Sequence, residues 1–230
     1  MPAVTTRNKP KSFAWSYSKL KNYETCPKRY WHVDVKRDVK EEEGEALRYG
    51  NTVHTVLAQY LERGTILPPV HEPTLKPWAD KIKAGTGELL VEQKYAITKD
   101  FGPCEWFAPN AWYRGIGDVV KVQGPVAAIV DWKTGKILED SVQLALMAQC
   151  VFSHFPDVQK VKTLFVWLKE DAQTVQTFAR EDMPGIWARI LPRVQALEQA
   201  HKETSFPPTP NGLCKRYCPV TQCPHHGEGR

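Results

Sequence analysis

Residues 126–133 read Val126-Ala127-Ala128-Ile129-Val130-Asp131-Trp132-Lys133, an apolar run that ends in an acid, a spacer and a lysine. A short continuous apolar run is typical of a buried β-strand. Residues two apart along a strand share a face, so Asp131 and Lys133 point to one spot at the end of this strand. There the carboxylate can hold a hard cation, and the lysine can steady a water molecule or a phosphate group.

The segments around this strand predict an α/β fold, in which a central mixed β-sheet is flanked by helices on both faces. Before the strand, we predict a helix that Ser16 or Ser18 caps, helices over 46–62 and 78–83, a proline-rich loop over 65–77, and strands over 89–97, 104–109 and 112–122. After it, we predict a helix over 141–155, strands over 162–168 and 174–179, and a helix over 184–200. Pro192 should kink or split this last helix.

The length of 230 residues suits one domain. Within it we expect a flexible basic tail over 1–11, a helical part over 12–88, a core over 89–203 and a cysteine-rich tail over 204–230. The net charge of +5 permits binding to a polyanion without establishing it. No apolar run approaches the length of a membrane span or suits secretion, so we expect a cytoplasmic protein without a membrane partner.

Side chains suited to binding a cation occur in several predicted elements, in the order His54, Glu92, Asp118, Asp131 and Gln143. Carboxylates and an imidazole are ligands for a divalent cation, and a nitrogen ligand extends the choice from magnesium to manganese. Taken one at a time, these residues have ordinary explanations: Asp118 as a turn residue, His54 as a satisfied helix histidine, Asp131 and Lys133 as an exposed ion pair, and Gln143 as a surface amide. Their joint occurrence in this order favours a site.

This order of His54, Gly115-Ile116-Gly117-Asp118, Asp131-Trp132-Lys133 and a helical Gln143 resembles the PD-(D/E)XK nuclease superfamily. It is most similar to the RecB-like branch, which includes CRISPR-associated nucleases and many phage exonucleases. The resemblance implies a restriction-endonuclease-like core with an N-terminal helical part. It also implies a metal-dependent deoxyribonuclease of a phage or prokaryote, an exonuclease on single strands or DNA ends that acts in recombination, repair or CRISPR adaptation, with a possible protein partner from those processes.

The resemblance assigns roles to particular residues. Mg²⁺ or Mn²⁺ would be held by His54, Asp118, Asp131 and the backbone carbonyl of Trp132. Lys133 would act on the attacking water, Gln143 would orient Lys133 or the water, and Glu92 would touch the metal through water. One departure from the branch is Met147, since relatives carry tyrosine four residues after the glutamine.

Three cysteines crowd into the tail, at Cys214, Cys218 and Cys223. In an intracellular protein, such clusters are more often metal ligands than disulfides. In several RecB-like nucleases, one cysteine before the core and three after it hold a [4Fe–4S] cluster, and Cys26 matches the first position. The tail spacing differs from the usual Cys-x2-Cys-x5-Cys. Because histidines follow at 225 and 226, a zinc site stays an alternative.

DNA binding is assigned to the basic and aromatic residues Lys28, Arg29, Tyr30, Tyr113 and Arg114. Aromatic residues that could stack on unpaired bases are Trp15, Tyr17, Tyr30, Trp31, Trp106, Phe107, Trp112 and Trp132. Two alternatives to a nuclease remain: a nuclease-fold module that binds DNA ends or a partner without cutting, and a zinc-tailed nucleic-acid adaptor.

Overall fold

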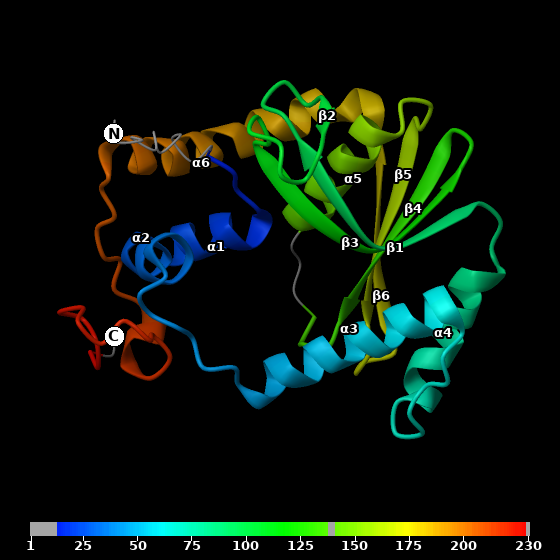
Figure 1. Ribbon diagram of the computed structural model, residues 1–230, viewed down its shortest axis with the longest axis horizontal. Coiled ribbons are helices and arrows are strands. Elements are labelled where there is room, and N and C mark those ends of the chain that lie inside the picture. The colour runs from blue at the N-terminus through cyan, green and yellow to red at the C-terminus, as the bar shows by residue number, and fades with distance from the viewer. Residues whose placement is uncertain (1–12, 138–140, 229–230) are drawn as a thin grey trace, which may run out of the picture.

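The computed structural model describes residues 13–137 and 141–228, which form one mixed six-stranded sheet in the order β2-β1-β3-β4-β5-β6 (Figure 1). The strands are β1 (Glu88–Ile97), β2 (Pro103–Cys104), β3 (Tyr113–Gln123), β4 (Val126–Lys133), β5 (Lys160–Trp167) and β6 (Ala172–Ala179). β4 and β5 are parallel over their whole length, from Val126–Lys160 to Lys133–Trp167, and the other neighbours are antiparallel. The predicted central mixed sheet is confirmed.

Helices cover both faces of the sheet, as Figure 1 shows. α5 (Ser141–His154) makes the crossover between the parallel strands, and it packs with α6 (Met183–Glu203) on one face. α3 (Glu45–Arg63) and α4 (Glu72–Ala84) lie on the other. Each face has its own apolar core, because successive strand residues point to opposite sides: Ile129 packs with the α5 core and Val130 with the α3 core. The helical layers on both faces confirm the predicted fold class.

The N-terminal helices and the C-terminal tail lie together at one end of the molecule (Figure 1). α1 (Tyr17–Thr25) begins after Ser16, whose hydroxyl accepts the Lys19 N–H at 3.4 Å. α2 (Pro27–Tyr30) and a π-helical turn (Trp31–Lys36) follow, and short 3₁₀ turns cover Arg180–Asp182 and Gly212–Lys215. The basic tail expected over 1–11 lies outside the described residues.

Two predicted breaks differ in the structure. α4 begins at Glu72, so the predicted proline-rich loop over 65–77 ends before that residue; Leu75 and Ala79 are buried on the inner face of this helix. α6 runs through Pro192 without interruption. Pro192 is on the exposed side of that helix, where water can bond the carbonyl that the proline leaves free. In both helices, burial of an apolar face outweighs the local cost of proline.

The strand predicted over 104–109 is also mostly absent. β2 ends at Cys104, and residues 105–112 form successive turns, in which backbone bonds join Ala108 to Glu105 and Ala111 to Ala108. This loop places Trp106 and Phe107 near the start of β3 instead of in the sheet.

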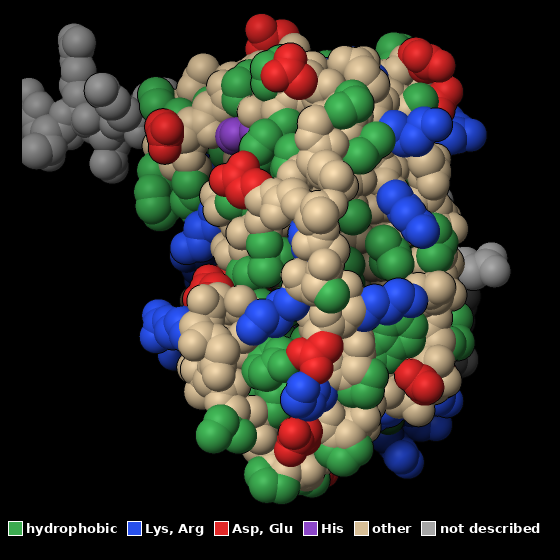
Figure 2. Space-filling model, turned by 90° about the vertical axis from the view of Figure 1, so that its right-hand side faces the viewer, with side chains coloured by type: hydrophobic (Ala, Val, Ile, Leu, Met, Phe, Trp, Pro, Cys, Tyr) green, Lys and Arg blue, Asp and Glu red, His purple; other side chains and the backbone are tan. Residues whose placement is uncertain are grey.

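The side of the molecule shown in Figure 2 carries Lys and Arg interspersed with Asp and Glu. Opposite charges mixed in this way give no extended positive field on this face. In the described part of the chain, no helix is both long and apolar enough to cross a membrane.

α5 packs very close to β3 because β3 carries glycine at two positions beneath it. A Cβ on Gly115 would lie 2.8 Å from Met147 Sδ, and one on Gly117 would lie 3.1 Å from Met147 Cε. Met147 is only 5% exposed, so it has little room to move aside. The Gly115-Ile116-Gly117 sequence therefore sets the distance between this helix and the sheet.

Candidate active site

A cleft of about 780 Å³ opens where β3 and β4 stop pairing. The last pair of their ladder is Val119–Val130, and the next residue toward the cleft on each strand is an acid, Asp118 or Asp131. Asp118 Oδ2 accepts the Trp132 N–H at 2.8 Å, a bond that ties the two strands together beyond the end of the ladder. Residues from α3, from the three strands β1, β3 and β4, and from α5 line the cleft.

Asp131, Lys133 and Gln143 form one connected group within this cleft. Lys133 Nζ lies 2.6 Å from Asp131 Oδ2 and donates to Gln143 Oε1 at 3.0 Å, while Gln143 Nε2 donates to Asp131 Oδ1 at 2.7 Å. The strand period puts the acid and the lysine on the same face, and the first turn of α5 brings the amide over them. The lysine is thereby held in one position while 27% of its side chain remains exposed to the cleft.

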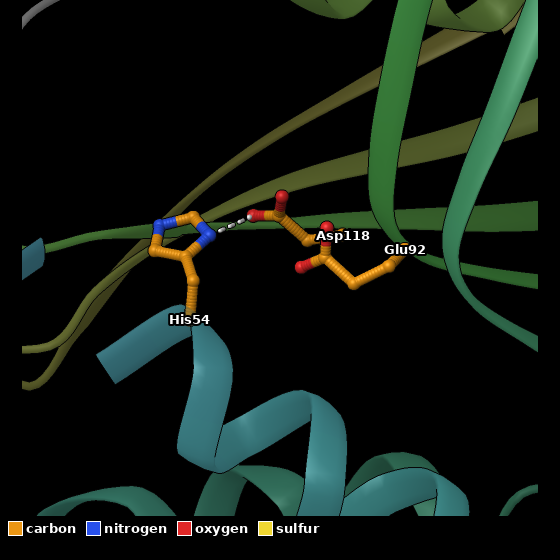
Figure 3. A group of neighbouring side chains, drawn as sticks. All are labelled: His54, Glu92 and Asp118. Atoms are coloured by element: carbon orange, nitrogen blue, oxygen red, sulfur yellow. Dashed lines mark ion pairs between the residues drawn. The ribbon is translucent and has the colours of Figure 1, made fainter. Parts of the chain in front are cut away.

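His54, Glu92 and Asp118 form a second group, shown in Figure 3. One ligand atom from each lies within 4.8 Å of the others, and His54 Nδ1 is 3.3 Å from Asp118 Oδ2. The histidine projects from α3 toward the two carboxylates, which come from the neighbouring strands β1 and β3 (Figure 3).

Glu92 reaches this group through an unusual backbone. Its φ is +49°, in the left-handed region that favours glycine, although it lies in the middle of β1. The regular pairs on either side are Val91–Val119 and Gln93–Gly117. A left-handed non-glycine residue costs about 1–2 kcal/mol, and such strain is concentrated at functional sites.

The electrostatics of the cleft indicate an excess of negative charge. Burial and the neighbouring charge of Asp118 raise the pKa of Asp131 to about 6, against the opposing effects of Lys133 and His54. Desolvation and Asp118 likewise raise the pKa of Glu92. Burial acts to lower the pKa of His54, but the hydrogen bond and charge of Asp118, with Asp131 and Glu92, outweigh it and raise that pKa. All three groups favour an added positive charge, which a bound cation would supply.

The donor set fits a divalent cation. Two carboxylates and an imidazole offer hard oxygen and borderline nitrogen ligands. Asp131 Oδ2 is buried and has no hydrogen bond of good geometry, only the ion pair with Lys133. Its second oxygen is engaged by Gln143.

The structure brings the predicted site residues into one cleft but groups them differently. His54 and Asp118 are joined by Glu92, which the sequence assigned to an indirect contact through water. Asp131, predicted as a direct ligand, contacts Lys133 and Gln143. Trp132, predicted to bind the cation through its carbonyl, donates its backbone N–H to Asp118 Oδ2.

Among the cleft residues that the sequence analysis missed are Asn51 and Thr134. Asn51 lies three residues before His54 on α3, a spacing that puts both side chains on one helix face and could have identified it. Thr134 lines the cleft just beyond β4 and lies 3.2 Å from the Cβ position of Gly50 on α3. No local pattern distinguishes it from an ordinary loop threonine.

The five residues expected to bind DNA are divided among three places. Arg114 lines a hollow next to the cleft. Tyr113 and Tyr30 are 1% and 2% exposed, and the Tyr30 hydroxyl is bonded to His201 Nε2 at 2.8 Å, so neither ring offers a face on which a base could stack. Lys28 and Arg29 lie beside the cysteines, and Arg29 is paired with Glu41 and Asn22.

The four cysteines singled out by the sequence, Cys26, Cys214, Cys218 and Cys223, line one small pocket with His225 and His226. All are free thiols. The Thr209 N–H donates to Cys26 Sγ and the Asn211 N–H donates to Cys214 Sγ, both at 3.4 Å. Arg29 Nε in the same pocket is buried without a hydrogen-bond partner. Cys26, between α1 and α2, thus meets the C-terminal tail at this pocket.

Residues 14–224 match the family model of the PD-(D/E)XK nuclease superfamily, and the chain belongs to that superfamily. It is therefore a hydrolytic nuclease by family, which implies a DNA substrate. The fold is similar to the solved structure of a protein named "Putative exonuclease" from Eubacterium rectale, with a TM-score of 0.52 and 14% identity over 94% of this chain and 92% of that one. A second structure, of SSO0001, matches with a TM-score of 0.45 and 13% identity over 95% and 89% of the two chains. No curated protein matches this sequence.

Proposed function

We propose that this protein is a deoxyribonuclease that depends on Mg²⁺ or Mn²⁺ and hydrolyses the phosphodiester backbone in the cleft between α3 and the sheet. The observation that carries the proposal is the adjacency of the two groups described above. The Lys133–Asp131–Gln143 group and the His54–Glu92–Asp118 group line the same cleft. One provides a positioned ammonium, and the other provides a set of cation ligands.

The chemical role of each residue follows from its contacts. His54, Glu92 and Asp118, with Asp131 beside them, would hold a divalent cation, which supplies Lewis-acid polarisation of the phosphate and lowers the pKa of a bound water. Lys133 presents its ammonium to the cleft as a donor to a water or a phosphate oxygen. Gln143 fixes the lysine and the carboxylate relative to each other, so the ammonium does not have to be ordered during the reaction.

The proposal includes exonuclease action on single strands or DNA ends, and membership of the RecB-like branch with a role in recombination, repair or CRISPR adaptation, in a phage or its prokaryotic host. Its support is the order of motifs along the chain and the name of the Eubacterium rectale protein that shares this fold. A protein partner from one of those processes is part of the same proposal.

The test is cleavage of end-labelled single-stranded DNA with and without Mn²⁺, using substrates blocked at the 5′ or the 3′ end. We expect cleavage only with the cation, and its loss in Asp118→Asn and Lys133→Ala. The matched control is Lys162→Ala, an exposed lysine on β5 outside the cleft. Full cleavage by Lys133→Ala would refute the assignment. Binding without cleavage by the wild type would indicate a non-cleaving end-binding module.

We also propose that Cys26, Cys214, Cys218 and Cys223 hold a [4Fe–4S] cluster, with zinc as the alternative. The four cysteines line one pocket, and their number matches the four thiolates that such a cluster takes. The backbone N–H bonds to two of the sulfurs suit thiolate ligands.

A cluster at this position would join residue 26 to the tail and so stabilise the fold by restricting the unfolded chain. The experiment is visible absorbance with iron and zinc analysis of anaerobically purified protein, for the wild type and Cys218→Ser. We expect broad visible absorbance and iron in the wild type, with a lower melting temperature for the variant. Stoichiometric zinc without iron would refute the cluster.

A further inference from the structure

A second hollow, of about 430 Å³, adjoins the candidate active site. The two spaces share Ile116 and Gln143 as lining residues, so a strand bound at Lys133 can continue from one into the other. The walls of the hollow come from residues 14–19, from Arg114 and Gly115 of β3, and from Trp106 in the loop after β2. None of these residues takes part in the contacts of the two groups in the cleft.

Arg114 lines this hollow and forms no ion pair with an acidic side chain among the described residues. Its backbone is fixed on both sides, because its N–H donates to the Trp15 carbonyl at 2.9 Å and it pairs with Ala96 of β1. Its Nε is buried and has no hydrogen-bond acceptor. Its guanidinium carbon lies 5.7 Å from the centre of the Trp106 ring and 6.0 Å from the centre of the Phe107 ring. An arginine that is fixed in this way, and that forms no ion pair among the described residues, is suited to bind a phosphate.

The surrounding charge is also positive. Lys19 lines the same hollow, and burial lowers its pKa, with further lowering by Arg37 and Arg114 against the opposing effect of Asp34. Lys19 therefore adds a second cation to the hollow, and Arg37 and Arg114 repel it while Asp34 attracts it. An anion in the hollow would relieve that repulsion.

Trp106 and Phe107, the aromatic residues beside Arg114, do not belong to either apolar core. Phe107 is 85% exposed, and Trp106 is half-buried, with Arg114 and Lys94 both near its ring, the latter 5.8 Å from the ring centre. By contrast, Trp15 and Trp112 nearby are fully packed in the core. Exposed aromatic rings beside cations are the common means of holding unpaired bases.

We propose that this hollow binds the nucleotide next to the scissile phosphate of a single DNA strand, with its phosphate on Arg114 and its base stacked on Trp106. A base that stacks on a side chain has left its duplex neighbour, so the subsite selects single strands or frayed ends. This inference rests on the proposed nuclease function. It assigns the preference for single strands to the loop that carries Trp106, which lies outside the superfamily motifs of this sequence.

The binding test uses metal-free protein and a fluorescent single-stranded oligonucleotide, so it does not depend on cleavage. We expect Trp106→Ala and Arg114→Gln each to weaken binding about tenfold. Trp106→Phe should restore most of the affinity, because it keeps a stacking face. Arg114→Gln should also reduce the slope of log Kd against log salt concentration by about 0.7, the value for one lost phosphate contact with a single strand. Arg189→Gln, an exposed arginine on α6, is the matched control.

Two further measurements separate stacking from a general effect on the fold. An oligonucleotide with 2-aminopurine at its terminal or penultimate positions should lose fluorescence on binding the wild type and keep it on binding Trp106→Ala. The same oligonucleotide with abasic sites at those positions keeps its sugars and phosphates, and Trp106→Ala and the wild type should bind it equally. Unchanged affinity for the normal oligonucleotide in both variants, or an equal loss with the abasic one, would overturn the proposal. A wild type that binds with these properties but does not cleave the oligonucleotide with Mn²⁺ would refute the nuclease function and leave the subsite standing.

Discussion

Replacing Asp131 by asparagine should stabilise the metal-free protein while it removes nuclease activity. The pKa of Asp131 is raised from 3.8 to about 6, first by burial and then by the charge of Asp118. Because the folded protein holds this proton to a higher pH than the unfolded chain does, the ionised carboxylate destabilises the fold above about pH 6. Each pKa unit corresponds to about 1.4 kcal/mol, so the destabilisation at neutral pH is about 3 kcal/mol.

Asparagine keeps the shape of this side chain without its charge. Its amide oxygen can still accept from Gln143 Nε2, which donates to Asp131 Oδ1 at 2.7 Å, while its amide nitrogen replaces Oδ2 and Lys133 turns toward the cleft, to which it is partly exposed. Asp131 is only 9% exposed, so solvent screens little of the effect. The expected gain in unfolding free energy is about 3 kcal/mol at about pH 7.5, and it should decrease to zero below about pH 4, where the carboxylate is neutral in both states.

The assay is urea unfolding followed by tryptophan fluorescence, in chelator-treated buffer at about pH 7.5 and pH 4. The control is Asp157→Asn, which removes an exposed carboxylate and should change stability little at either pH. Added Mn²⁺ should stabilise the wild type more than Asp131→Asn, because ligands that bind only the folded state stabilise it. A variant no more stable than the wild type at about pH 7.5 would mean that the carboxylate is not desolvated, and the electrostatic reasoning would be wrong.

Three further outcomes follow from the site. Glu92→Gly should raise the metal-free unfolding free energy by about 1 kcal/mol, because the left-handed backbone at φ +49° suits glycine, and it should weaken Mn²⁺ binding; equal Mn²⁺ affinity by calorimetry would contradict the ligand role. Gln143→Ala should lower kcat about 10- to 100-fold with little change in KM, because Lys133 loses the partner that orients it; steady-state kinetics on a short oligonucleotide would measure this. Mn²⁺ affinity should decrease as the pH falls through the raised pKa of His54, since a protonated imidazole does not bind metal, and His54→Ala should remove much of this dependence in a calorimetric titration.

The sequence was most informative where local pattern and burial agree. β4 runs from Val126 to Lys133, one residue beyond the strand over 126–132 that its apolar run predicts, and α5 begins at Ser141 as predicted. The strand period alone puts Asp131 and Lys133 on one face. Their convergence with Gln143 follows from the crossover helix that a parallel pair requires.

What the sequence could not predict depends on contacts between distant segments. The left-handed backbone of Glu92 places it beside His54 and Asp118, and nothing in the sequence around it requires that conformation. Burial of Tyr30 and Tyr113 likewise comes from packing with α6 and with Trp15, which cannot be read from the two tyrosines alone. The helical continuation through Pro192 depends on which side of α6 faces solvent.

The two glycines of β3 set the spacing between the sheet and α5, and this spacing also places Gln143 in the candidate active site. Gln143 is one helical turn before Met147, the residue that rests on Gly115 and Gly117. A methyl group at either glycine would push that methionine outward, and the start of α5 would move with it. The amide that bonds both Lys133 and Asp131 would then be carried away from them. An alanine at either glycine would thus reduce turnover by lifting a helix, and a smaller side chain at 147 would restore it.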